Sequence, residues 1–181
     1  LLFEELLTLN LAWAPPVDIW PLVNVVNDLI DLHHEHVSTS DSTLANLRAS
    51  LDLYYQQHGK YPGAVTAVPA ACAGTAGDGV ATGGAGATAA DAFLEQLSLY
   101  TDAAGGACSQ SSATLKFGPY LKKATLPPDP FKGVSTIEVV NTGDLVGLTA
   151  TGADFAASPG GYKYDSSTGK IIFNVFGEDG R

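Results

Sequence analysis

The chain has 181 residues, a length that fits one domain or one domain with an appendage. Its hydrophobic content of 45% supplies enough apolar surface for a core, which excludes an ordinary disordered chain. The formal net charge of −10 disfavours a phosphate backbone or an anionic membrane surface as a partner, so we expect no binding to nucleic acid.

The N-terminal part of the chain has a helical pattern that prolines interrupt. Residues 1–10 predict an amphipathic or buried helix. Proline lacks an amide donor and clashes with the preceding turn, so we expect this helix to break or unwind between Pro15 and Pro21. Helical spacing then resumes over residues 22–58, where the first apolar face contains Leu22, Val25, Val26 and Leu29.

The end of this long helix is well marked. Apolar residues recur at steps of three and four, and they are Leu44, Leu47, Leu51 and either Tyr54 or Tyr55. Gly59 follows, and Pro62 lies three residues further, which is typical of a helix end. We therefore divide the chain into a long helix over residues 1–58 and a globular domain over residues 59–181.

The globular part alternates Gly-rich and Ala-rich loops with short regular elements. Residues 63–88 predict a loop, and Thr88 with Asp91 fits a capping pattern for a short helix. The apolar face of that helix contains Phe93, Leu94, Leu97 and Tyr100. Runs at 134–141, 145–150, 161–165 and 170–175 predict three or four strands of a small antiparallel sheet. The predicted fold class is α+β, with the long helix packed on this sheet.

The histidines do not form a catalytic pattern. His33 and His36 can share a helix face, but their spacing is not that of a zinc protease motif. A metal there would need ligands from elsewhere, and a solvated helix face is the simpler interpretation. The sequence supports no Ser–His–Asp or Cys–His arrangement, so we expect no enzymatic activity.

Aspartates of the C-terminal half are the remaining candidates for a metal site. Asp129 could join Asp144, Asp154 or Asp165 as an oxygen ligand for calcium. In the simpler interpretation, the Asp129 carboxylate makes a local bond in its proline-rich turn. Because no EF-hand loop is present, we expect no resident cofactor and keep calcium as the alternative.

The two cysteines, Cys72 and Cys108, do not form a CxxC pair, which disfavours a structural zinc site. Two distant cysteines in an acidic, Gly-rich, exported chain favour one disulfide, and two buried thiols are the alternative. Such a bridge would stabilise the fold by roughly 3–4 kcal/mol.

Glu5 is the most informative charge, because it lies beside Leu6 and Leu7 in an apolar helix. Burying a lone carboxylate is costly, so Glu5 should find a positive partner. The candidates are Arg48, the chain's own amino terminus at Leu1, and the amino terminus of a neighbouring subunit.

Several of these segments resemble type IV pilins and the major pseudopilin of type II secretion. The stretch 47–62, in which Leu53-Tyr54 leads to Gly59-Lys60-Tyr61-Pro62, is similar to the end of the long helix in those proteins. Residues 118–131 and 161–171 resemble passages of their globular domain, including its terminal hairpin. Glu5 followed by two leucines stands at the family's register.

The resemblance implies a structural subunit of an extracellular, cell-surface filament, a helical polymer of identical copies joined through the N-terminal helix. Leu1, Glu5 and Pro21 would then serve assembly. The precursor would wait in the inner membrane, and the pilus or secretion assembly machinery would be a further partner.

Two alternatives remain open. One is the major pseudopilin of a type II secretion system, which works in the periplasm. The other is a secreted carbohydrate- or ligand-binding module, whose tyrosines would stack on sugars; the candidates are Tyr54, Tyr55, Tyr61 and Tyr162.

Overall fold

A computed structural model of the chain describes residues 20–81, 86–144 and 147–177. These residues form the helices α2 (Trp20–His58) and α3 (Ala87–Ser98). They also form the strands β1 (Tyr100–Thr101), β2 (Ala107–Cys108), β3 (Ile137–Val140), β4 (Tyr162–Asp165) and β5 (Ile171–Phe173). The α+β class predicted from the sequence is therefore confirmed.

The chain divides into two compact units, Leu1–Val37 and Ser38–Arg181, and the boundary between them falls within α2. We call the second unit, residues 38–181, the head. The sequence pattern placed the division at residue 58, where the helix ends. The C-terminal half of α2 belongs to the head because its apolar face lies in the head's core.

Helix α2 begins with a proline in its first turn and ends at a glycine. It begins at Trp20, so Pro21 lies in its first turn and not in a break. Proline is tolerated there because first-turn amides have no partner within the helix. At the other end, the Gly59 amide donates to the Tyr55 carbonyl (2.7 Å), and Gly59 has a φ of 66°, which glycine adopts without strain. The predicted break at Pro15 and the helix over residues 1–10 lie outside the described residues.

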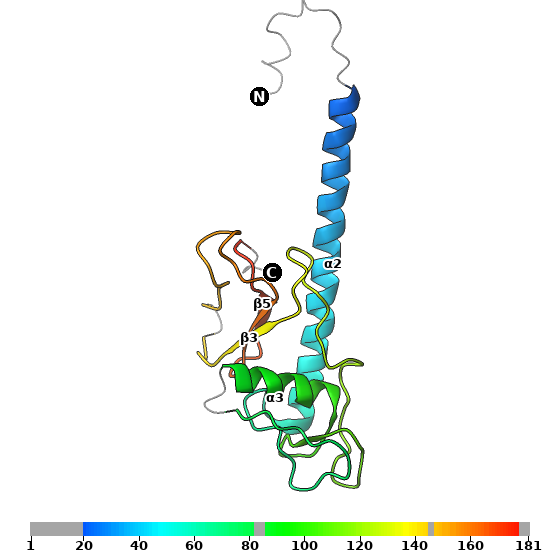
Figure 1. Ribbon diagram of the computed structural model, residues 1–181, viewed down its shortest axis with the longest axis vertical. Helices are drawn as coiled ribbons and strands as arrows, with labels where there is room; N and C mark the ends of the chain where they lie inside the picture. Colours follow the sequence, from blue (N-terminus) through cyan, green and yellow to red (C-terminus); the bar gives the residue numbers. More distant parts are fainter. Residues whose placement is uncertain (1–19, 82–85, 145–146, 178–181) are drawn as a thin grey trace, which may run out of the picture. The chain divides into compact units, whose positions relative to one another are not determined.

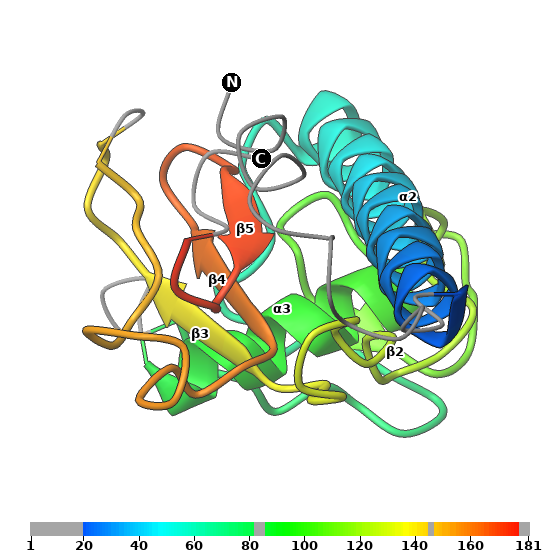
Figure 2. The same ribbon diagram turned by 90° about the horizontal axis from the view of Figure 1, so that it is seen from above.

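The core of the head forms where α2, α3 and the three-stranded sheet meet (Figures 1 and 2). The predicted face of α2 is buried, and Tyr54, not the exposed Tyr55, completes it. The other buried members of this cluster include Leu44, Leu47, Leu51, Phe93, Leu97, Tyr162, Tyr164 and Phe173. Large aromatic side chains therefore supply much of the apolar area that holds the helices on the sheet.

Helix α3 begins differently from its prediction. Its N-cap is Gly86, which offers no side-chain bond, so the Thr88–Asp91 capping pattern is not used. The Gly86 amide instead donates to the Val139 carbonyl (3.0 Å), which ties the start of α3 to β3. The expected capping box is wrong because the helix starts at Ala87, which places Thr88 inside the first turn.

A buried glutamine connects α3 to the neighbouring loops. Gln96 Oε1 accepts the Gly63 amide (2.8 Å), and its Nε2 donates to the carbonyls of Val65 and Gly105 (both 2.9 Å). All polar atoms of this amide are therefore satisfied, as a buried position requires. The Gly-rich loops on both sides of α3 are held by one side chain.

The sheet is mixed, not antiparallel as the sequence pattern predicted. Its order is β3-β4-β5, with β3 parallel to β4 and β4 antiparallel to β5. Parallel neighbours require a crossover connection, and residues 141–161 provide one. The predicted strand at 145–150 forms no strand in its described residues 147–150, because that stretch belongs to the crossover. The predicted terminal hairpin is confirmed as β4 and β5.

Candidate functional site: the apolar face of helix α2

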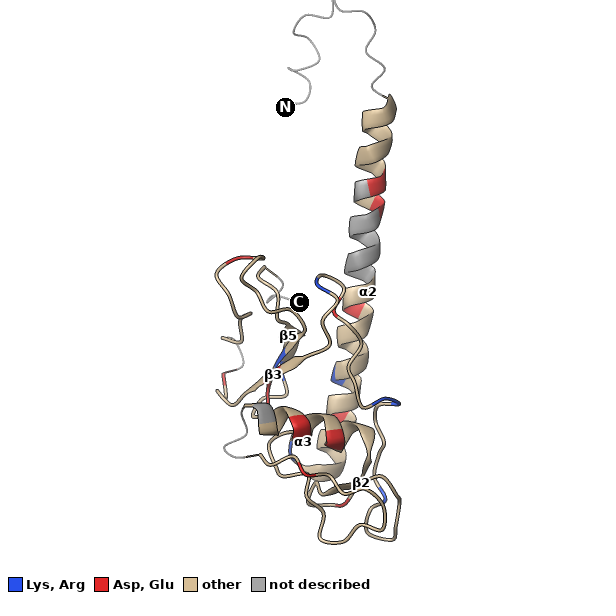
Figure 3. Cartoon of the chain, viewed as in Figure 1, with Lys and Arg blue, Asp and Glu red and all other residues tan. Residues whose placement is uncertain are grey.

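The first turns of α2 expose a row of large apolar side chains. Their exposed fractions range from 38% to 69%, and the residues are Trp20, Leu22, Val23, Val25, Val26 and Ile30. Figure 3 shows that the opening turns of α2 carry no charged residue. A soluble protein that exposes a contiguous apolar row of this kind generally uses it for binding.

Most of these apolar residues share one side of the helix, whereas Trp20 lies on the other side. At about 100° per residue, Leu22, Val25, Val26 and Ile30 lie within an arc of about 140°. The polar residues Asn24, Asn27, Asp28 and Asp31 lie on the opposite side. A helix with a single apolar stripe is suited to packing on one side against another helix. Among the described residues, we find no helix with the length and apolar character needed to cross a bilayer.

The structure places one of the three predicted assembly residues. Pro21 is exposed in the first turn of α2, next to the apolar stripe. Leu1 and Glu5 lie outside the described residues. Arg48, a candidate partner for Glu5, donates from Nη2 to the Ile171 carbonyl (3.2 Å), so it also serves the packing of the head.

The histidine cluster lies on the continuous helix α2, but the side chains of residues 32–38 are outside what the structure describes. Elsewhere, the described side chains include no group of three His, Cys, Asp or Glu placed to hold a metal ion.

Asp129 is buried and saturated with backbone donors. Its carboxylate accepts four amide hydrogen bonds, from Phe131 (2.9 Å), Lys132 (2.6 Å), Val134 (2.9 Å) and Gly161 (2.8 Å). The first three close the turn that follows the prolines, and the fourth joins this turn to the start of β4. The structure therefore supports the turn-bond interpretation of Asp129 over a calcium ligand.

Asp165, a second calcium candidate, has a similar role at the end of β4. It accepts the amides of Thr142 (3.2 Å), Gly143 (3.1 Å) and Ser167 (2.8 Å), and also the Thr142 hydroxyl. Burial alone would raise the pKa of Asp165, but these hydrogen bonds hold it below its ordinary value. The carboxylate thus fastens the start of the crossover to the sheet.

The other two candidates lie in the crossover. Asp154 Oδ1 accepts the Ala157 amide (2.8 Å), and the Asp144 amide donates to the Thr142 hydroxyl (3.3 Å). The four aspartates do not converge as one ligand set within the described residues.

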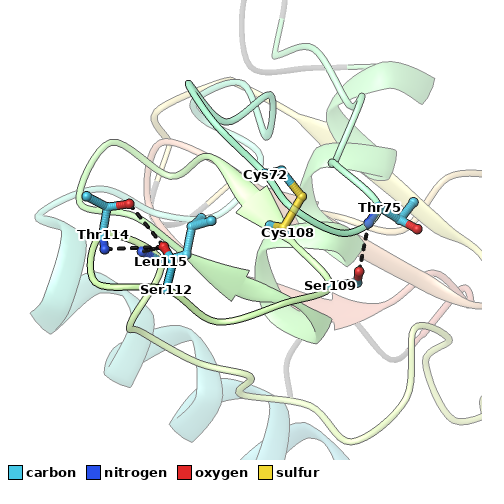
Figure 4. Close-up of a disulfide and its surroundings, with 7 residues drawn as sticks. All are labelled: Cys72, Thr75, Cys108, Ser109, Ser112, Thr114 and Leu115. Carbon is cyan, nitrogen blue, oxygen red and sulfur yellow. Dashed lines mark hydrogen bonds between the residues drawn. A yellow bond between two sulfur atoms is a disulfide. The ribbon is translucent and has the colours of Figure 1, made fainter.

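Cys72 and Cys108 form the predicted disulfide, with a Cα–Cα distance of 5.7 Å (Figure 4). Next to it, the Thr75 amide donates to Ser109 Oγ (2.8 Å), and the Ser109 amide donates to the Thr75 carbonyl (2.9 Å). The Ser112 hydroxyl accepts the Leu115 amide (3.1 Å) in the following turn. The bridge therefore pins two loops that contain little apolar material of their own.

The double substitution Cys72→Ala, Cys108→Ala is expected to lower the free energy of unfolding by about 3–4 kcal/mol, because the reduced chain regains loop entropy. Urea denaturation measures this loss, and wild-type protein unfolded under reducing conditions is the matched control. Two alkylatable thiols in native, unreduced protein would contradict the assignment.

Two of the four tyrosines proposed for sugar stacking are inaccessible. Tyr54 and Tyr162 have no exposed surface, and Tyr164 shares their environment. Tyr55 and Tyr61 stack on each other, with ring centroids 4.5 Å apart. Tyr54 and Tyr162 therefore belong to the core, and the prediction that they stack on sugars is wrong. For Tyr55, which is 44% exposed, and the half-buried Tyr61 it stays a prediction.

The sequence pattern missed a polar group at the end of α2. His58 Nε2 lies 3.0 Å from the Tyr120 hydroxyl and 3.1 Å from Thr101 Oγ1, and its ring stacks on Tyr54. Burial lowers the pKa of His58. Its hydrogen-bond partners are more than forty positions away in the sequence, so no local spacing could have indicated these bonds.

Comparison with known proteins does not place the chain in a group: no protein family, curated protein or solved structure matches it.

Proposed function

We propose that this protein is a structural subunit of an extracellular filament of the type IV pilus kind, in which identical copies join through their N-terminal helices. The observation that carries the proposal is the exposed apolar stripe of α2. Covering the exposed part of each aliphatic side chain contributes about 1 kcal/mol. A head-to-tail contact that repeats between identical copies without closing into a ring produces a helical polymer.

The head has properties that suit such a subunit. It has its own aromatic core and a disulfide, which persists in an oxidising, exported environment. Its acidic composition keeps exposed surfaces soluble. In this proposal the head faces solvent, and the first unit provides the contacts between subunits.

The residues before α2 complete the proposal. Glu5 is proposed to pair with the amino terminus, at Leu1, of a neighbouring subunit, which would set the axial register. The precursor is proposed to wait in the inner membrane before the assembly machinery takes it up. The resemblance over residues 47–62 supports both steps, and it applies equally to a short periplasmic pseudopilus.

A charge in the apolar stripe is expected to block assembly. Val26→Asp places a carboxylate in the proposed contact, whereas Asn27→Asp places the same group about 100° away on the polar side. A loss of about 1.4 kcal/mol in the contact between subunits lowers its affinity about tenfold. We therefore expect Val26→Asp to lower the filament yield at least about tenfold, and Asn27→Asp to leave it unchanged. The melting temperature of the head should not change, because residue 26 lies in the other unit.

The measurement is negative-stain microscopy of producing cells, with an antibody against the head to label filaments. Label along thin surface filaments supports a pilus, and label confined to the periplasm supports the pseudopilus. Filaments of normal yield from Val26→Asp would contradict assembly through this stripe, and a chain that remains monomeric in its own cells would contradict the proposed function.

A further inference from the structure

Two strands of the head, and the residue that follows a third, bring a carboxyl, an amine and an amide together on one face of the sheet. Lys163 of β4 pairs with Glu138 of β3 on one side and with Ile172 of β5 on the other. Asn174 directly follows the last residue of β5, and its side chain contacts Glu138 on this face. Figure 2 shows the three strands side by side, with β4 in the centre.

The three side chains are in contact through the Glu138 carboxylate. Asn174 Nδ2 donates to Glu138 Oε2 (2.9 Å), and Lys163 Nζ lies 3.4 Å from Glu138 Oε1. The amide nitrogen therefore lies within direct proton-transfer reach of the carboxyl group, and the amine pairs with the same group at a longer distance.

Thr151, from the crossover, forms hydrogen bonds with all three side chains. Its hydroxyl accepts a hydrogen bond from Lys163 Nζ (2.9 Å) and donates to Glu138 Oε2 (2.7 Å). Its backbone amide donates to Asn174 Oδ1 (2.6 Å). A donor fixed on this oxygen polarises the Asn174 carbonyl and would stabilise negative charge that develops on it.

This arrangement contains the parts needed for amide exchange. An amine becomes a nucleophile when it gives up its proton, and an adjacent carboxylate can take that proton. Asn174 is 2% exposed, and the Lys163 side chain is 16% exposed, so water has poor access to the same carbonyl. Lys163 supplies the amine of this group, and Glu138 and Thr151 connect it to the amide.

We propose that Lys163 and Asn174 join through an intramolecular amide bond. Lys163 Nζ passes one proton to Glu138 through the Thr151 hydroxyl and attacks Asn174 Cγ, and the charge on Oδ1 faces the Thr151 amide. The Cγ–Nδ2 bond then breaks, Glu138 delivers that proton to the departing nitrogen, and ammonia leaves. The second proton that Nζ loses as the new amide forms passes to solvent. One C–N bond forms and one breaks, so the step needs no oxidant or other reactant.

The crosslink has a direct mass signature. The full chain, matured at pH 9 to raise the neutral fraction of the amine, is expected to lose about 17 Da as ammonia, beyond the loss for the disulfide. Trypsin should then fail to cut after Lys163, because an acylated lysine is not a substrate. Residues 133–170 and 171–181 should appear as one branched peptide instead of as separate fragments.

Two variants separate this bond from other chemistry. Lys163→Arg retains the positive charge, and we expect it to keep the full mass. If Asn174 instead cyclised with its own backbone, this variant would lose ammonia as well. Glu138→Gln retains the size of the side chain and is expected to keep the full mass because it lacks the proton acceptor. Intact disulfide and unchanged circular dichroism show that each variant is folded.

Wild-type protein with full mass after incubation, and with free tryptic fragments ending at Lys163, would overturn the proposal. Equal loss of ammonia from wild type and Lys163→Arg would overturn it as well, in favour of backbone cyclisation. Loss of ammonia with branching in Glu138→Gln would overturn the role of Glu138.

Discussion

A chain that lacks residues 1–37 is expected to fold into a monomeric head that retains its disulfide. The unit Ser38–Arg181 keeps the buried face of α2, including Leu44 and Leu51, together with α3 and the sheet. The removed part carries exposed apolar side chains that contribute no core to the head. Circular dichroism should show a cooperative melt, and gel filtration should show a monomer at concentrations at which the full chain associates.

A longer truncation is the matched control. Removal of residues 1–47 also takes Leu44 and Leu47, which are 0% and 3% exposed. Loss of a buried leucine costs about 2–5 kcal/mol, so the loss of two should cost at least about 4 kcal/mol and leave much of the protein unfolded. Equal stability of the two truncations, or an unfolded 38–181 chain, would contradict the placement of the head's boundary.

Replacement of Asp129 by alanine is expected to lower the free energy of unfolding by more than about 3 kcal/mol. The substitution leaves four backbone amides without their acceptor, and each unsatisfied buried donor costs about 1–3 kcal/mol before relaxation. It also frees the turn after the prolines from the start of β4. Urea denaturation followed by fluorescence measures the loss.

Two further substitutions show whether the amide bonds are the cause. Asp129→Asn keeps one carbonyl oxygen and should lose less than alanine does, because this oxygen can still accept two donors. Asp154→Ala removes an acceptor from an exposed loop, where its side chain binds the Ala157 amide, and should cost less than about 1 kcal/mol. Similar losses for Asp129→Ala and Asp154→Ala would contradict the anchoring role of Asp129.

Local patterns in the sequence determined the elements whose signals lie within a few residues. Leu44, Leu47 and Leu51 repeat at helical steps, and the repeat predicted the buried face of α2 because one side of a helix must meet the core. Gly59 predicted the helix end, since glycine alone takes a positive φ without strain. The disulfide followed from the count of two cysteines in a chain of this composition.

The tertiary structure decided everything that depends on residues far apart in the chain. The direction of β4 follows from the path of residues 141–161, and strand patterns carry no signal for direction. The sequence marked Asp129 as a turn residue or a metal ligand, but only the fold brings the Gly161 amide to it. Glu138 and Lys163 meet because β3 and β4 share one register, and Asn174 joins them from the residue after β5. Register is a property of pairing, not of any single strand.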